Sequence, residues 1–219
     1  DLITTYQAIV DDLGGIARHL RRYKQAHCDE HYYATRTQWN TRRHVWSAAK
    51  RAATFIYLNK TCFNGLWRVN RAGHFNVPVG RYTNPTIYMP EALRAAREVL
   101  ARTELRAADY RAVIADAEAG DLVYLDPPYQ PLSATASFTS YTAGAFDENE
   151  QRALAEAARG LAARGCHVVV SNSNAALIRP LYQGFRIDRV RCSRSINSVG
   201  SGRGEIDELI ITRSHACPP

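Results

Sequence analysis

The chain has 219 residues and a formal net charge of +7, from 28 lysine and arginine residues against 21 aspartate and glutamate residues. With 46% hydrophobic and 22% charged residues, the composition is typical of a globular protein and excludes an intrinsically disordered one. No stretch approaches the roughly 20 consecutive apolar residues that a membrane-spanning helix needs, and the first residues lack the layout of a signal peptide. We therefore expect no membrane association.

The cysteines and histidines argue against metal and disulfide sites. Five cysteines, at positions 28, 62, 166, 192 and 217, are scattered along the chain and odd in number. This pattern argues against a disulfide framework and a structural zinc site, and it favours a reducing compartment, the cytoplasm. His27 and His31 have the spacing of one helical turn, but no cluster of further ligands surrounds them, so we expect no metal site.

The charge is unevenly distributed. The sixty residues from His31 to Pro90 contain nine lysines and arginines and no aspartate or glutamate. This segment therefore carries +9 and leaves −2 for the rest of the chain. It also holds 11 of the 21 aromatic residues. Arginines interleaved with aromatic rings suit phosphates and stacked bases, so the segment indicates binding to nucleic acid, although a solvated basic surface has the same charge.

Two helical regions are predicted before a long irregular segment. Apolar residues recur every three or four positions over the first 28 residues, with a break or kink expected at Gly14-Gly15. A second helix is predicted from Arg43 to Leu58. Residues 59–88 are rich in Asn, Gly and Pro and have no sustained period. Such a long irregular segment in a domain is usually functional, and its aromatic residues argue against disorder.

From residue 90 onward the pattern alternates between helix and strand. Pro90 stands at the first turn of a helix that is predicted to reach about Arg102. Asp147 begins a later helix in the manner of a capping box, and Gly165 ends it. Buried strands are predicted at 122–125 and 167–170, and a final hairpin-like pair of strands at 186–192 and 206–212. Strands that alternate with helices indicate an α/β sheet.

The sharpest chemical signal is the tetrapeptide Asp126-Pro127-Pro128-Tyr129, which directly follows a predicted strand. Ligands of α/β sheets bind at the carboxyl ends of strands. The two prolines remove two N–H donors, so the Asp126 carboxylate and the Pro127 carbonyl can accept both hydrogens of one amino group. Tyr129 offers a flat face to a planar ring. The motif therefore fits the exocyclic amine of a nucleobase, held for attack on an electrophilic methyl group.

The tetrapeptide also has a structural interpretation, in which Asp126 caps a turn after a strand that ends at two prolines. The apolar run before it and the basic segment earlier in the chain favour the catalytic interpretation. A cysteine nucleophile for cytosine-C5 chemistry is expected in a Pro-Cys context, which neither Cys62 nor Cys166 has. Both cysteines are predicted to be structural.

This motif and its surroundings resemble the Dam-type family of DNA adenine-N6 methyltransferases, of the D12 class and alpha group. The resemblance covers nearly the whole chain and is most specific in Thr61–Asn70 (TCFNGLWRVN) and Gly73–Tyr82 (GHFNVPVGRY). These two stretches look like the hairpin loop with which the family enters the DNA grooves. Residues 132–139, 194–196 and 207–209 match as well.

Within the loop, the resemblance implies DNA contacts residue by residue. Phe63 matches an aromatic residue that wedges into the duplex beside the target base, and Asn64 matches a residue that supports the DNA there. Leu66 and Arg68 match residues that read bases, the arginine by a bidentate contact to guanine. Arginine is also the general choice for guanine in the major groove, which supports this assignment independently.

The resemblance also implies the substrate and the cofactor. Pro78 matches another base contact, and Tyr82 matches a contact near the first base pair. The family methylates adenine in double-stranded DNA, best known at GATC, with S-adenosylmethionine as donor, and the target base has to leave the stack to be reached. Residues 126–129 then form the catalytic motif, and Asp126 and Tyr129 also lie beside the cofactor.

For the fold, the resemblance implies an α/β architecture, with a Rossmann-like methyltransferase sheet and an inserted, mainly helical target-recognition domain. Residues 1–30 and 89–219 are expected to form the catalytic domain. Residues 31–88 are expected to form the target-recognition domain with its DNA-contacting hairpin loop. We expect the protein to bind double-stranded DNA as a monomer without an obligate protein partner.

One part of the family pattern is missing from this sequence. The family begins with a lysine-rich segment, a strand with a glycine-rich turn, and a second strand that ends in an acidic residue for the cofactor ribose. Asp1-Leu2-Ile3 looks like the point just after that acidic residue, so we expect a sheet that is incomplete at its N-terminus. A fragment of a longer protein and a natural short form both explain this.

Two functions from different classes stay open. The first is a site-specific adenine-N6 methyltransferase, and the second is a truncated or catalytically impaired DNA-binding module of the same family. Methylation of cytosine N4 or of a protein glutamine is disfavoured, because those groups usually carry Ser or Asn at the position of Asp126.

Overall fold

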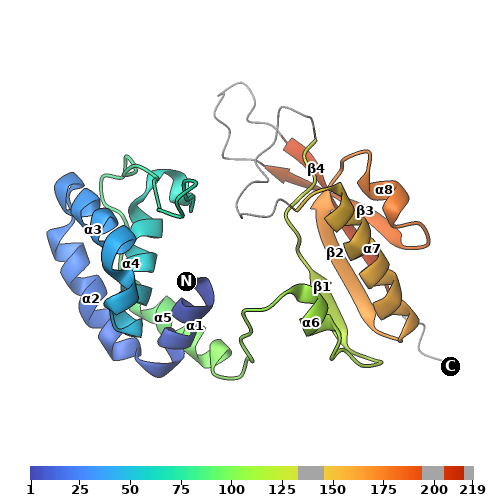
Figure 1. Cartoon of the computed structure of the whole chain (residues 1–219), viewed down its shortest axis with the longest axis horizontal. Coiled ribbons are helices and arrows are strands. Elements are labelled where there is room, and N and C mark those ends of the chain that lie inside the picture. Colours follow the sequence, from blue (N-terminus) through green and yellow to red (C-terminus); the bar gives the residue numbers. More distant parts are fainter. Residues whose placement is uncertain (133–145, 194–204, 215–219) are drawn as a thin grey trace. The chain divides into compact units, whose positions relative to one another are not determined.

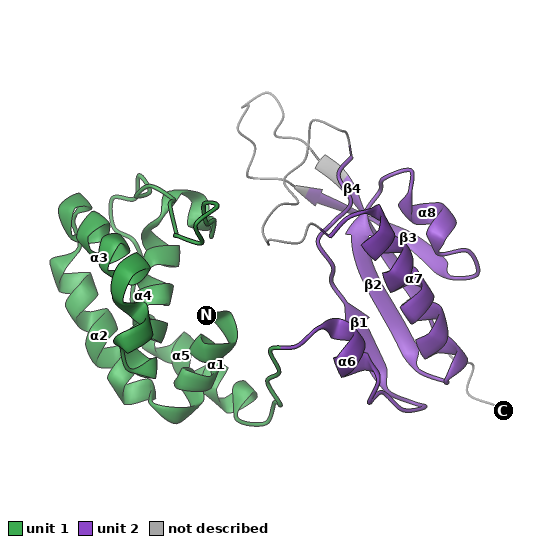
Figure 2. Ribbon diagram, in the orientation of Figure 1, with its two compact units in different colours: residues 1–107 green, residues 108–219 purple. Residues whose placement is uncertain are grey.

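The structure is a computed structural model that describes residues 1–132, 146–193 and 205–214. Residues 133–139 and 194–196, which belong to the stretches that resemble the methyltransferase family, lie outside the described residues. The chain divides into two compact units, Asp1–Ala107 and Ala108–Pro219, and each has a hydrophobic core of its own (Figures 1 and 2).

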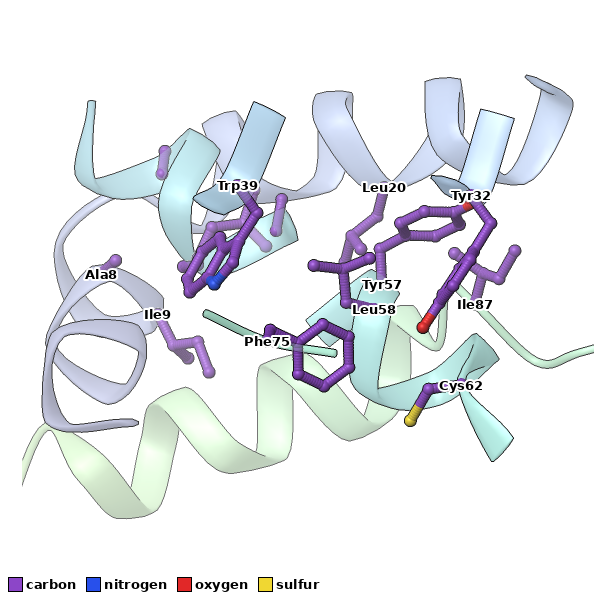
Figure 3. Close-up of a cluster of buried hydrophobic side chains, with 14 of the residues drawn as sticks. Ala8, Ile9, Leu20, Tyr32, Trp39, Tyr57, Leu58, Cys62, Phe75 and Ile87 are labelled. Carbon is purple, nitrogen blue, oxygen red and sulfur yellow. The ribbon is translucent and has the colours of Figure 1, made fainter. Parts of the chain in front are cut away.

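Unit 1 consists of helices around the central helix α4, followed by a long loop. Its elements are α1 (Leu2–Asp11), α2 (Leu13–Ala26), α3 (Asp29–Arg42), the 3-10 turn η1 (Arg43–Val45), α4 (Ala48–Thr61), the 3-10 turn η2 (Phe63–Gly65) and α5 (Pro90–Leu100). Helices α1, α2 and α3 all pack against α4. Leu20, Trp39, Tyr57, Leu58 and Phe75 meet in the core of this unit (Figure 3).

The break in the N-terminal helix lies earlier than predicted. Helix α1 ends before Asp12, and Asp12 is the N-cap of α2, where its Oδ1 accepts a hydrogen bond from the Gly15 amide at 2.8 Å. Gly15 itself lies inside α2, close to α4, since a Cβ there would lie 2.9 Å from the Cβ of Ala49. The glycine therefore serves helix packing, and the aspartate starts the new helix.

Helix α3 was not predicted, and α4 begins later than predicted. The buried residues of α3 are Tyr32, Thr35 and Trp39, so a polar residue interrupts its apolar face and hides the helical period. Ser47 caps α4 by accepting a hydrogen bond from the Lys50 amide, which sets the start of α4 after the predicted Arg43. Helix α5 begins at Pro90 as predicted.

The two units differ from the division of the chain that the sequence suggests. Residues 1–30 and 89–107 share one unit with 31–88, because α1 and α2 bury apolar residues in the core that surrounds α4 and α5 packs partly buried apolar residues against it. This division does not test the role of residues 31–88 in DNA recognition, which stays a prediction.

Unit 2 is a mixed α/β unit with a small four-stranded sheet. Its elements are α6 (Tyr110–Ile114), β1 (Leu122–Leu125), α7 (Glu148–Ala163), β2 (His167–Ser173), α8 (Ile178–Leu181), β3 (Arg186–Ser193) and β4 (Glu205–Arg213). The strand order is β1-β2-β4-β3, with β1 parallel to β2 and the other pairs antiparallel. The predicted α/β class and the final antiparallel strand pair are confirmed.

One face of this sheet packs against α7, and the other face is open along β1. Leu125, Val168 and Val170 are buried in a cluster with the apolar side of α7. Leu122 and Tyr124 point to the opposite face and are 70% and 58% exposed. The predicted burial of this strand therefore holds for one face only, because β1 is an edge strand of the described sheet.

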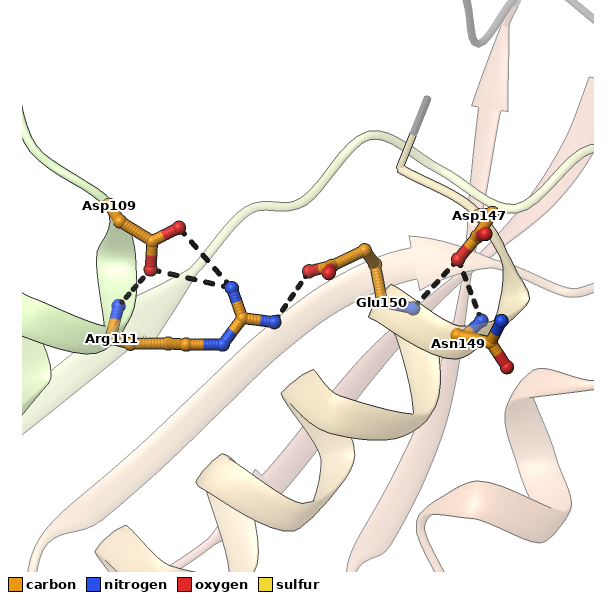
Figure 4. Close-up of polar contacts among 5 residues, drawn as sticks. All are labelled: Asp109, Arg111, Asp147, Asn149 and Glu150. Carbon is orange, nitrogen blue, oxygen red and sulfur yellow. Dashed lines mark hydrogen bonds and ion pairs between the residues drawn. The ribbon is translucent and has the colours of Figure 1, made fainter. Parts of the chain in front are cut away.

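Polar side chains determine where α7 begins and connect it to α6. Asp147 accepts hydrogen bonds from the amides of Asn149 and Glu150 at 2.9 and 3.0 Å, which confirms the predicted cap (Figure 4). Arg111 of α6 forms an ion pair of 2.7 Å with Glu150 and also contacts Asp109 (Figure 4). This pair is largely exposed and contributes little to stability. At the other end, Gly165 has a φ of 92° and ends α7 as predicted.

Candidate active site and recognition loop

The Asp126-Pro127-Pro128-Tyr129 motif directly follows β1, and the strand register determines its neighbours. Leu125 pairs with Val170 of β2, so the next residue, Asp126, emerges beside Ser171. The Ser171 hydroxyl donates a hydrogen bond of 2.5 Å to the Asp126 Oδ1. The other carboxylate oxygen accepts no hydrogen bond from the residues that the structure describes. One carboxylate oxygen is held, and the other is available for a ligand.

The backbone that follows Asp126 is held by buried amide side chains. The Gln151 Nε2 donates to the Pro128 carbonyl at 2.9 Å, and the Asn172 Oδ1 accepts from the Gln130 amide at 3.1 Å. The two side chains also bond to each other, from Asn172 Nδ2 to Gln151 Oε1 at 3.0 Å. Both are fully buried. Ser173 adds a hydrogen bond to the Gln130 carbonyl.

Tyr129 lies half-buried beside β4. Its hydroxyl donates to the Glu208 Oε2 at 3.4 Å. Burial raises the pKa of the Tyr129 hydroxyl, so the hydroxyl stays protonated at neutral pH and remains a donor. The ring is therefore tethered at its hydroxyl end, next to the carboxylate of Asp126.

Sequence reasoning found the motif itself and missed the residues that hold it. Gln151, Ser171, Asn172 and Ser173 are all buried polar residues that contact the motif or the next residue, Gln130. A signal was present: the apolar run of β2 ends in three consecutive polar residues, Ser-Asn-Ser. Buried polar side chains need hydrogen-bond partners. Three of them in a row at the end of a buried strand therefore indicate a polar segment beside that end.

The other predicted site residues lie in unit 1, in the loop between α4 and α5. Two isolated antiparallel bridges, Cys62 with Val79 and Val69 with Phe75, bring the outgoing and returning parts of this loop together. The Phe63 amide donates to the Pro78 carbonyl at 2.9 Å, so these two predicted DNA contacts are neighbours. The loop thus folds back on itself like a hairpin.

The start of the loop presents an exposed aromatic ring on a constrained turn. Phe63 is 48% exposed. Asn64 and Gly65 after it both have positive φ angles, 53° and 62°. Asparagine and glycine tolerate this left-handed conformation best. The Asn59 side chain fixes the turn by donating to the Gly65 carbonyl at 2.7 Å, and Leu66 packs half-buried against the core.

The tip of the loop orients the predicted base-reading arginine. The exposed Arg68 donates from its Nε to the Asn76 Oδ1 at 3.0 Å. Asn70 closes the tip by accepting hydrogen bonds from the amides of Ala72 and His74, both at 3.0 Å. Among the described residues, Arg68 makes this hydrogen bond through its Nε alone, which leaves its two terminal nitrogens available.

Three side chains from α3 hold the returning part of the loop. Tyr32 and Arg36 both donate to the Val77 carbonyl at 2.9 Å. Asn40 bonds twice to Phe75, accepting from its amide at 2.8 Å and donating to its carbonyl at 2.9 Å. The three residues are spaced one helical turn apart and form one row on α3. Arg36 therefore supports the loop.

Tyr82 and Cys62 have structural surroundings that the sequence did not reveal. The exposed Tyr82 ring lies against Gly80, where a Cβ would collide with the ring and would lie 2.8 Å from the Cys62 carbonyl. Burial raises the pKa of the Cys62 thiol to about 11, so the thiol is protonated and unreactive at neutral pH. This agrees with the prediction that Cys62 is structural.

The two histidines with helical spacing bind a tyrosine. His27 and His31 contact the Tyr57 hydroxyl through their Nδ1 atoms at 3.0 and 3.2 Å. Within the described ranges, no group of three or more His, Cys, Asp or Glu residues lies close enough to hold a metal ion. The described helices also include none that is long and apolar enough to cross a membrane.

Comparison with known proteins identifies the family. The model of the D12 class N6 adenine-specific DNA methyltransferases matches residues 1–196. A type II methyltransferase, M.MjaIII, of Methanocaldococcus jannaschii is 38% identical over an alignment of 220 positions, which covers 96% of this chain and 76% of that protein. The chain therefore belongs to the D12 class of adenine-specific DNA methyltransferases.

Two further relatives carry names that agree with this class. The DNA adenine methylase of Escherichia coli K12 is 39% identical over 214 residues, which cover 96% of this chain and 75% of that enzyme. The DNA N-6-adenine-methyltransferase of Escherichia phage P1 is 36% identical over 214 residues, which cover 96% of this chain but 28% of that protein.

Proposed function

We propose that the protein transfers a methyl group from S-adenosylmethionine to N6 of adenine at GATC in double-stranded DNA. The observation that carries this proposal is the Asp126 carboxylate at the end of β1, with one oxygen held by Ser171 and the other available. The resemblance of the loop at 61–82 to that of the Dam-type family supports GATC as the site. The scattered cysteines, free where described, favour the cytoplasm as its compartment. That the protein is a monomer is part of this proposal.

The proposed chemistry uses acceptors rather than an enzyme nucleophile. The free oxygen of Asp126 and the Pro127 carbonyl accept the two hydrogens of the target amine. The Pro127 carbonyl accepts no hydrogen bond from any described residue, whereas the next carbonyl, that of Pro128, is already bonded to Gln151. Two acceptors on its hydrogens favour the pyramidal geometry in which the nitrogen lone pair can attack. The Tyr129 ring supports the base.

The donor side of the reaction needs a cofactor. S-adenosylmethionine, when bound, supplies the electrophilic methyl group. Asp126 and Tyr129 are the residues of the described chain that would hold it, since they combine a carboxylate acceptor with an aromatic ring at the carboxyl end of β1. Beside them, the exposed Leu122 and Tyr124 leave that face of β1 open to further groups.

The loop of unit 1 is proposed to read the DNA. Phe63 offers an exposed ring of the kind that fills the space left by a flipped base. Arg68 keeps both terminal nitrogens available for the O6 and N7 of a guanine, while Asn76 fixes its Nε. The hairpin is held by α3, so these side chains are presented on a rigid support.

A methyl-transfer assay with matched duplexes tests the proposed function. The complete natural protein is incubated with S-adenosylmethionine labelled in its methyl group and with duplexes that carry either one GATC or one GTAC site in the same context. We expect label on adenine N6 in the GATC duplex alone, identified by mass spectrometry of the nucleosides. Specific binding to GATC without any transfer would instead support a DNA-binding module, and transfer to both duplexes would contradict the site.

Replacing Arg68 with alanine is expected to relax discrimination at one base pair of the site. The loss of a bidentate contact to guanine costs about 1–3 kcal/mol at that position, so affinity for GATC should approach affinity for the duplex changed at that pair. Competition binding against each single-base variant measures this. Arg71→Ala, three residues on in the same hairpin, is the control and should weaken all sequences equally. A uniform loss for Arg68→Ala as well would mean that it contacts only phosphate.

A further inference from the structure

We propose that Ser171 is a positioning residue for methyl transfer, and that the buried Gln151–Asn172 pair fixes the backbone of the same site. This inference rests on the proposed function of Asp126 and extends it to residues on β2 and α7. Ser171 acts on the direction of the carboxylate, and the amide pair acts on the chain between Pro128 and Gln130.

The first step concerns the carboxylate of Asp126, which is exposed and follows the last residue of β1. The torsion that turns a carboxylate about its Cβ–Cγ bond has broad preferences, so an unheld Asp126 would present its oxygens in many directions. The Ser171 hydroxyl donates to Oδ1 at 2.5 Å, the length of a strong hydrogen bond to an ionised acceptor. Holding one oxygen sets the direction of the other.

The second step concerns the rigidity of Ser171 itself. It is only 2% exposed and lies in β2, between two neighbouring strands. Val170 before it pairs with Leu125 of β1, and Ser171 pairs with Ile210 of β4. Because both sides of the strand are hydrogen-bonded, the hydroxyl is presented from a fixed backbone. A rigid donor beside a mobile acceptor is the arrangement that a positioning residue needs.

The third step concerns the backbone around Tyr129. Gln151 donates to the Pro128 carbonyl, Asn172 accepts from the Gln130 amide, and the two amides bond to each other. They thus connect the residues on either side of Tyr129 through buried groups. Turning either amide over would place two donors or two acceptors together, so the network has one arrangement. The motif therefore keeps its shape before any ligand arrives.

The test compares two isosteric replacements at position 171 in the complete natural protein. Threonine and valine have the same shape and both suit a strand, but only threonine keeps the hydroxyl. We expect Ser171→Val to lower kcat about 10- to 100-fold, the worth of a hydrogen bond to a charged group. We expect Ser171→Thr to retain most of kcat. The Kd for GATC duplex, the KM and the melting temperature should differ little between the two variants.

Thr212→Val is the matched control, because it removes a hydroxyl from the same face of the neighbouring strand, where Thr212 pairs with Val169. It should leave kcat unchanged. Equal kcat for Ser171→Val and Ser171→Thr would overturn the inference, as would a loss of kcat in Ser171→Val that is matched by an equal loss of DNA binding.

Asp126→Ala is measured in parallel, to separate this inference from the proposed function. If Asp126→Ala keeps activity, the proposed function of the motif fails. If Asp126→Ala loses activity but the two variants at position 171 do not differ, only the positioning role is refuted.

Discussion

Replacing Asp126 with alanine is expected to lower the rate of methyl transfer by about three orders of magnitude, while the affinity for GATC duplex stays within a few fold. The rate should fall because the target nitrogen loses its charged acceptor, and preorganised electrostatic contacts of this kind contribute about 10²–10³-fold each. Affinity should remain because the proposed DNA contacts lie in unit 1. Single-turnover methylation and equilibrium binding to the same duplex measure the two effects separately.

A second aspartate next to β1 provides the control. Asp121 precedes β1, at its opposite end, and accepts a hydrogen bond from the Glu118 amide at 2.8 Å. Asp121→Ala removes the same type of side chain at the other end of β1 and should leave the rate of methyl transfer unchanged within about twofold, because substitutions at exposed positions away from the site have small effects. Methyl transfer at the original rate by Asp126→Ala would show that the motif is not the catalytic site.

Replacing Phe75 with alanine is expected to destabilise unit 1 by about 3–5 kcal/mol, the usual cost of removing a buried aromatic ring. Phe75 is 1% exposed, and its ring stacks on Trp67 with 4.3 Å between the ring centroids. Its backbone also holds the loop to Asn40. Urea unfolding followed by tryptophan fluorescence measures the loss, and DNA binding should fall with it because the loop loses its support.

Phe63→Ala is the matched control, because it removes the same side chain from the same loop at an exposed position. Its free energy of unfolding should change by no more than about 0.5 kcal/mol. Binding to GATC duplex should nevertheless weaken, since the exposed ring is the proposed wedge. Similar destabilisation by both substitutions would contradict the burial pattern of this loop, and unchanged DNA binding by Phe63→Ala would contradict the wedge.

Elements whose signals are local were predictable. The cap of α7 needs only Asp147 and the amides two and three residues later, so a few residues of sequence contain all the necessary information. The same holds for Pro90 at the start of α5 and for Gly165 after α7. The helix break shows the limit of local reasoning, since Gly14-Gly15 and Asp12 are nearby alternatives, and only the structure shows that Asp12 caps α2 and that Gly15 lies inside it, close to Ala49.

Helix α3 was not predictable from periodicity, because its inward side combines apolar core residues with polar residues that form hydrogen bonds to the loop. Tyr32 and Trp39 belong to the core, whereas Arg36 and Asn40 use their side chains to bond the loop at Val77 and Phe75. A helix that binds another segment through polar groups does not show a continuous apolar stripe.

The sequence by itself determined the residues on which the proposed chemistry depends: the Asp-Pro-Pro-Tyr motif, the basic and aromatic segment, and the strands and caps around them are all contiguous in the chain. Only the tertiary structure decided which residues hold that chemistry in place. Ser171 meets Asp126, and Asn172 meets Gln130, across 45 and 42 residues of chain. Such pairs depend on strand register, and a shift of one residue would turn Ser171 to the other face of the sheet, so no local pattern can specify them.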